Sequence, residues 1–109
     1  MKADVPPGTA DQAVALVTSL AGGHWQQART DFSARMTEAL DAARLAEGWA
    51  RTASVVGSYE GMGEPFARRV GDQIIVEVPL RFEAGDGIAR VVFDADGKVG
   101  GLWLRPADG

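Results

Sequence analysis

The last third of the chain, residues 71–106, contains three turn sequences, and these constrain the fold more than any other feature. They are Val70-Gly71-Asp72-Gln73, Ala84-Gly85-Asp86-Gly87 and Asp94-Ala95-Asp96-Gly97-Lys98. Glycine adopts the positive φ angle that tight turns require, and an aspartate side chain hydrogen-bonds to nearby backbone amides. The stretches between the turns, residues 74–83, 88–94 and 99–105, are rich in β-branched and aromatic residues. This region is therefore predicted to form an antiparallel meander.

The first half of the chain carries helix signals. Residues 9–12 fit a capping box with Thr9 as the N-cap, and apolar residues then recur at intervals of three and four. Gly22-Gly23 predicts the end of this helix. A second helical stretch is expected from about Trp25 to Leu40, and at the boundary over residues 32–41 either one kinked helix or two short ones satisfy the pattern. A further helix, capped by Asp41, is expected to end near residue 51.

Helices followed by strands predict the α+β class, with the N-terminal helices packed on one face of an antiparallel sheet of four or five strands. Strands are expected to begin near Ala53, over residues 54–60 and 66–70, and to continue through the meander. Residues 9–106 are predicted to form a single domain, which a flexible tail over residues 1–8 precedes.

The predicted sheet is apolar on both faces. One face of its longest strand carries only apolar side chains, namely Ile74, Val76, Val78, Leu80 and Phe82. The other face also gains apolar area, from Ile75, Pro79 and Val92. The last strand carries apolar side chains on both faces, namely Val99, Leu102, Trp103 and Leu104. The helices cover one face, and an apolar second face needs a cover of its own. A homodimer through this second face is therefore predicted.

Composition excludes several classes of partner. The net charge is −4 and the two lysines lie near opposite ends of the chain, which argues against nucleic-acid binding. No apolar run approaches the roughly 20 residues of a membrane span, and no signal-peptide core follows the N-terminus. The sequence contains no cysteine, so disulfides and thiolate chemistry are excluded. A cytoplasmic protein without membrane partners is expected.

Several motifs in a fixed order resemble a small bacterial domain family of unknown function. The resemblance covers about residues 10–106 and is carried by Leu20-Ala21-Gly22-Gly23-His24-Trp25, Val76-x-Val78-Pro79-Leu80-x-Phe82-Glu83 and Val92-Phe93-Asp94-x-Asp96-Gly97-Lys98-Val99. Such domains are similar to the nuclear transport factor-like and ketosteroid isomerase-like superfamily, and some precede α/β-hydrolase domains of the dienelactone hydrolase type. The resemblance implies a curved, cone-like (cystatin-like) sheet around helices, with a cavity and a dimer. It supplies no catalytic residue.

Four residues are candidates for acid–base chemistry: His24, Asp31, Tyr59 and Glu60. His24 is the only histidine, a residue type that serves as a general base, but it also sits where a helix begins, which favours a structural role. Either carboxylate would serve as a base if burial raised its pKa. A single histidine does not make a zinc site, so no metal and no cofactor are predicted.

An unusually large set of aromatic and methionine side chains is the candidate binding site: Trp25, Phe32, Met36, Trp49, Tyr59, Met62, Phe66 and Trp103. The simplest interpretation is an ordinary core. The same residues would also line a cavity between helices and sheet that binds a small, largely apolar molecule.

Three functions follow from these patterns. A cavity without titratable groups indicates a small-molecule-binding domain. A carboxylate or histidine that points into an aromatic cavity indicates a cofactor-free cyclase, isomerase or dehydratase. A filled core with an apolar outer sheet face indicates a dimerisation or accessory module beside a hydrolase.

Overall fold

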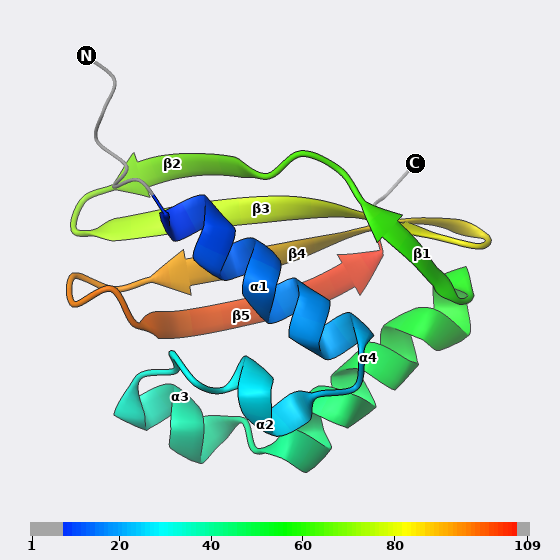
Figure 1. The fold of residues 1–109 in the computed structure, drawn as a ribbon, viewed down its shortest axis with the longest axis horizontal. Helices are drawn as coiled ribbons and strands as arrows, with labels where there is room; N and C mark the ends of the chain where they lie inside the picture. The colour runs from blue at the N-terminus through cyan, green and yellow to red at the C-terminus, as the bar shows by residue number, and fades with distance from the viewer. Residues whose placement is uncertain (1–7, 107–109) are drawn as a thin grey trace.

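The fold of the protein is known from a computed structural model, which describes residues 8–106. In this range four helices precede five strands, which confirms the α+β class (Figure 1). The elements are α1 (Thr9–Ala21), α2 (Trp25–Ala28), α3 (Ala34–Ala39), α4 (Ala42–Val56), β1 (Tyr59–Met62), β2 (Phe66–Val70), β3 (Gln73–Phe82), β4 (Gly85–Phe93) and β5 (Val99–Pro106). Of the predicted tail over residues 1–8, residues 1–7 lie outside the described residues. None of the four helices combines the length and apolar character that a membrane span requires.

The ends of α1 confirm one prediction and correct another. The N-cap is Gly8, at φ 96°, and no side chain caps the helix, so the predicted role of Thr9 as the N-cap is wrong. Thr9 is instead the first helical residue and is buried. At the other end, the His24 amide donates to the Ser19 carbonyl at 2.8 Å and Gly23, at φ 77°, donates to Leu20, which is a Schellman motif.

Residues 25–40, expected as one helical stretch, form two short helices. The break falls at residues 29–33, where the Val99 amide donates to the Asp31 carbonyl at 2.7 Å and Ser33 donates to the Val99 carbonyl at 2.9 Å. Backbone hydrogen bonds to β5 therefore replace helical ones here. Asp41 caps α4 as predicted, because its Oδ1 accepts a hydrogen bond from the Arg44 amide at 2.9 Å.

Helix α4 runs further than predicted, and the strand expected over residues 54–58 is wrong. Val55 and Val56 favour strands intrinsically, but Val56 is buried in the core between the helices and the sheet. Burial of one helix face outweighs a local preference of a few tenths of a kcal/mol per residue. The helix ends at Gly57, whose φ of 87° a residue with a side chain rarely adopts.

All five strands belong to one open antiparallel sheet. Its order is β1-β3-β4-β5. Both β1 and β2 pair with the edge of β3 that faces away from β4: β1 pairs with residues 80–82 and β2 with residues 73–77. The connection between β3 and β4 is shorter than predicted, since Phe82 already pairs with Gly85 and residues 85–87 belong to β4.

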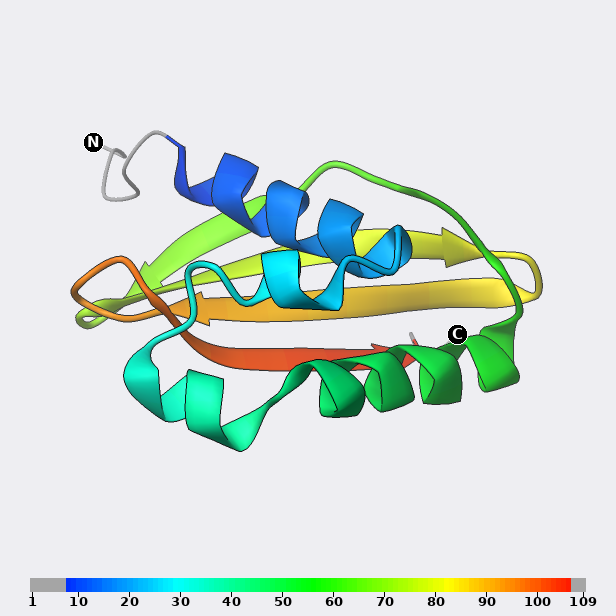
Figure 2. The ribbon, with the colours of Figure 1, turned by 60° about the horizontal axis from the view of Figure 1, so that its bottom comes forward.

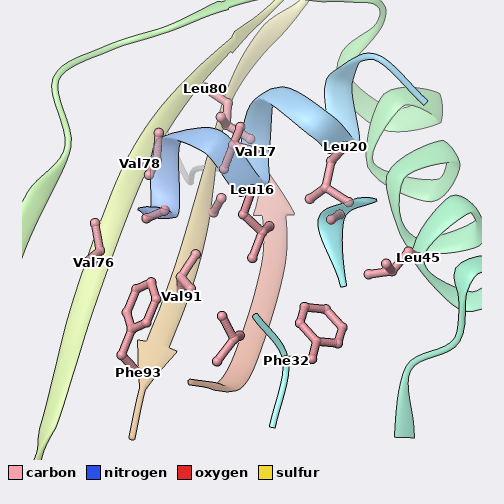
Figure 3. Close-up of a cluster of buried hydrophobic side chains, with 14 of the residues drawn as sticks. Leu16, Val17, Leu20, Phe32, Leu45, Val76, Val78, Leu80, Val91 and Phe93 are labelled. Atoms are coloured by element: carbon pink, nitrogen blue, oxygen red, sulfur yellow. The ribbon is translucent and has the colours of Figure 1, made fainter. Parts of the chain in front are cut away.

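The helices lie on one side of this sheet. Helix α1 crosses its face, and α2 to α4 extend the layer past β5 (Figures 1 and 2). Figure 3 shows the core between these layers, which combines side chains of α1 and α4 with alternate residues of β3 and β4. The predicted inward face of β3 is confirmed, because all five of its apolar residues are buried: Ile74, Val76, Val78, Leu80 and Phe82.

Candidate functional site

The eight predicted binding residues do not surround a single cavity. Phe32 and Met36 are buried in the core, and four others are half-buried against it: Trp25, Trp49, Tyr59 and Met62. Phe66 and Trp103 lie elsewhere, with 62% and 55% of their surfaces exposed. The strand pairing places both of them on the face of the sheet that points away from the helices, which we call the outer face.

Three aromatic rings contact one another between α4 and the sheet, in the region of the predicted cavity. Trp49 contacts Tyr59 and Phe82 at ring-centroid distances of 5.5 and 5.9 Å, and Tyr59 contacts Phe82 at 5.7 Å. Burial raises the pKa of the Tyr59 hydroxyl from its usual 10.0, while the nearby Arg81 cation partly lowers it. Five open clefts on residues 8–106 are lined by other residues, and none of these clefts includes Trp25, Trp49 or Tyr59.

The four acid–base candidates are spread over the molecule. His24 and Glu60 are exposed. Asp31 is half-buried, accepts a hydrogen bond from Gln12 Nε2 at 3.3 Å and lines an open cleft of about 230 Å³. Its backbone pairs with the start of β5, whereas Tyr59 pairs with Phe82 at the far end of β3. The length of β3 separates these two ends by about 25–30 Å. The candidates therefore do not form one catalytic group.

The outer face carries a row of four side chains that crosses the sheet. Phe66 of β2 pairs with Glu77 of β3, Glu77 with Arg90 of β4, and Arg90 with Trp103 of β5. Side chains that pair directly across antiparallel strands project from the same face. Two exposed aromatic rings thus flank a pair of opposite charges in the middle of the sheet.

The two charges of this row form a salt bridge. Arg90 donates from both Nε and Nη2 to Glu77 Oε2, at 3.0 and 2.7 Å. Both side chains are partly buried, at 39% and 28% exposed. This Glu77–Arg90 pair lies at the centre of the row. Its partial burial makes it a defined feature of the surface rather than a fluctuating exposed pair.

Two clefts adjoin this row and share Ile88 in their lining. The larger has a volume of about 500 Å³ and is lined by apolar groups of Phe66, Pro79 and Ile88 together with Arg81 and Asp86. The smaller, of about 290 Å³, lies among Ile75, Ile88, Arg90, Val92, Trp103 and Arg105. The predicted apolar character of Ile75, Pro79 and Val92 on this face is consistent with their positions. The outer face therefore exposes apolar side chains of all four strands, β2, β3, β4 and β5.

Phe66 and Trp103 are among the residues predicted to line the cavity, whereas the strand pairing places both on this surface. Trp103 lies four residues after the buried Val99, and in a regular strand residues an even number apart point to the same face. Regular alternation would therefore place Trp103 on the inner face. A bulge changes this, since Val92 pairs with Gly101 but Phe93 pairs with Val99. The extra residue, Gly100, reverses the alternation and turns Trp103 outward.

Comparison with known proteins identifies one family. A family model described as a protein of unknown function, DUF3887, matches residues 13–102. No curated protein and no solved structure matches the chain significantly.

Proposed function

This chain belongs to the DUF3887 family of proteins of unknown function, and we propose from its own residues that it is a dimerisation or accessory module. Its working surface is the outer face of the sheet, and the occupant of that face is a second copy of the chain. The observation that carries the proposal is the row Phe66–Glu77–Arg90–Trp103, which places two exposed aromatic rings around a salt bridge.

The size of the outer face supports this proposal. Strands β2, β3, β4 and β5 have 5, 10, 9 and 8 residues, and at about 3.3 Å by 4.8 Å per residue they make a face of roughly 500 Å². Specific interfaces begin at about 600 Å² per partner, and side-chain relief adds to the flat area. Exposed Phe66 and Trp103 are of the aromatic type that anchors such interfaces.

The packing of the aromatic cluster supports an accessory role over an enzymatic one. The ring contacts of Trp49, Tyr59 and Phe82 occupy the place where a substrate cavity was expected. An open antiparallel sheet with helices on one side is consistent with the nuclear transport factor-like and ketosteroid isomerase-like superfamily, to which we propose the family belongs. We further propose a cytoplasmic domain that accompanies a hydrolase.

Light scattering on wild-type and variant protein tests the dimer. Wild type is expected to have twice the mass of the chain at high micromolar concentration. Phe66→Glu and Trp103→Glu are expected to give monomers with an unchanged helical signal, because each places a charge in the interface. The matched control is Val55→Glu on α4, at a position that is 63% exposed and away from the outer face. A monomeric wild type contradicts the proposal.

A second candidate function is the binding of a small, largely apolar molecule in the larger outer cleft. The observation in its favour is a volume of about 500 Å³ lined by Phe66, Pro79 and Ile88. Ligand pockets commonly have this size and apolar lining. Enhanced fluorescence of anilinonaphthalene sulfonate with wild type and with Val55→Glu, but not with Ile88→Glu, is the expected result. Equal enhancement with all three proteins contradicts it.

A further inference from the structure

The charges of the outer face are arranged so that the face complements itself in one orientation. We propose that two copies pack with their two-fold axis parallel to the strands, between β3 and β4, so that Glu77 of each subunit pairs with Arg90 of the partner subunit. This inference rests on the proposed dimer and names its arrangement and the residues that specify it.

The strand pairing defines three complete rows on the outer face, which the Arg81–Asp86 pair extends towards the β3–β4 turn. Each row runs from β2 across β3 and β4 to β5, and Gly63, in the link before β2, begins the third row. The rows are Arg68–Ile75–Val92–Gly101, Phe66–Glu77–Arg90–Trp103 and Gly63–Pro79–Ile88–Arg105. Every row holds an apolar or oppositely charged pair at its centre.

Rotation about an axis along the strands exchanges β3 with β4 and β2 with β5 and leaves each row in place. Glu77 then faces the partner's Arg90, and Arg81 faces the partner's Asp86. Ile75 meets the partner's Val92 and Pro79 meets the partner's Ile88, so the apolar groups also match. The salt bridge within each chain becomes part of a square of four alternating charges, in which every charge has two opposite neighbours.

An axis across the strands gives a poorer match. Packed sheets keep their strands within about 30° of one another, so the axis runs either along or across them. An axis along the central row would place Glu77 on the partner's Glu77 and Arg90 on the partner's Arg90. Like charges in a partly desolvated interface repel strongly, which selects against this arrangement.

The edges of the face are complementary in the same orientation. The Trp103 ring covers Gly101 so closely that a Cβ at that glycine would lie 2.6 Å from two ring atoms. In the proposed dimer, Phe66 faces the partner's Trp103. Arg68 faces Gly101 of the partner subunit and therefore contacts the indole ring that covers this glycine. Stacking of an aromatic ring and a guanidinium on an indole is favourable in both cases.

The Glu77–Arg90 pairs would act mainly on specificity. Buried ion pairs often contribute little net affinity because desolvation offsets their attraction, but they penalise orientations that leave a charge unpaired. We therefore expect charge reversal at either position to abolish self-association and to create a preference for the opposite variant.

Charge reversal in separate chains tests the arrangement. Glu77→Arg and Arg90→Glu are each expected to weaken self-association at least tenfold, because each puts four like charges together in its own dimer. An equimolar mixture is expected to form a 1:1 heterodimer by native mass spectrometry. The double variant with both substitutions in one chain is expected to self-associate again. Glu38→Arg, on the exposed surface of α3, is the control and is expected to remain a homodimer.

Thiol crosslinking tests the same geometry without a change of charge, since the chain has no cysteine of its own. Phe66→Cys mixed with Trp103→Cys is expected to give a crosslinked heterodimer with a bismaleimide that spans the ~10 Å between packed sheets. Phe66→Cys alone is expected to give far less product, because its two copies lie at opposite edges. Efficient crosslinking of Phe66→Cys alone, or no heterodimer between the charge variants, overturns the arrangement while the dimer itself stands. A monomeric wild type removes the proposed function as well.

Discussion

The ring of Tyr59 on β1 meets the ring of Trp49 on α4 edge to face, with centroids 5.5 Å apart and planes inclined by 60°. Both rings also contact Phe82 of β3, so one aromatic cluster joins the last helix, the edge strand and the central strand. Edge-to-face contacts add stability beyond the burial of area. This cluster therefore holds α4 in register with the sheet.

Removal of the Trp49 ring should destabilise the domain. Trp49→Ala loses two ring contacts and leaves a gap beside Tyr59 and Phe82, and we expect it to lower the free energy of unfolding by about 2–4 kcal/mol. Val55→Ala, on the exposed side of the same helix, should change it by less than about 0.5 kcal/mol. Urea unfolding followed by circular dichroism measures both. Equal effects of the two substitutions would show that the cluster does not hold α4.

The raised pKa of Tyr59 makes stability depend on alkaline pH. Burial favours the neutral phenol in the folded state, so its contribution is complete below the usual pKa of 10.0 and is lost as the pH rises through the raised folded value. Wild type should therefore lose more stability between pH 8 and pH 11 than Tyr59→Phe does. Chemical denaturation at both pH values measures the difference. Parallel losses in the two proteins would contradict the partial desolvation of the Tyr59 hydroxyl.

Two glycines of the α4 region should respond in opposite directions to alanine. Gly57→Ala requires a side chain at φ 87° and places its Cβ 2.8 Å from the Cβ of Glu83. We therefore expect the free energy of unfolding to fall by about 1–3 kcal/mol. Gly48 lies within the helix with open space around it, and Gly48→Ala should stabilise the protein by about 0.5–1 kcal/mol. Melting temperatures give both signs. A stabilising Gly57→Ala would mean that α4 does not end there.

The cap of α4 depends on the carboxylate of Asp41. Asp41→Ala removes the acceptor for the Arg44 amide and should cost about 1 kcal/mol, whereas Asp41→Asn retains an acceptor oxygen and should cost less. The matched control is Asp11→Ala in the first turn of α1, which has no side-chain cap to lose. Thermal unfolding of the three variants ranks them. An Asp41→Ala protein as stable as wild type would contradict the capping role.

Four features could be predicted from the sequence because each depends on neighbours in the chain. They are the α+β class, the Schellman motif after α1, the Asp41 cap and the inward face of β3. A cap needs a side chain within three residues of the amide it accepts from, and a strand face needs only alternation. The apolar character of the outer face followed from the same alternation, through Ile75, Pro79 and Val92.

Tertiary contacts decided the rest. Burial of Val56 kept residues 53–56 helical against their preference for strand, and the hydrogen bonds of residues 31–33 with Val99 broke the second helical stretch in two. The bulge at Gly100 reversed the direction of Trp103 and moved it from the expected cavity to the outer face. None of these follows from local pattern, because each depends on which distant strand a backbone group meets. The same long-range pairing aligned Phe66, Glu77, Arg90 and Trp103 across four strands, and so only the folded sheet, not the order of residues, created the surface on which the proposed function rests.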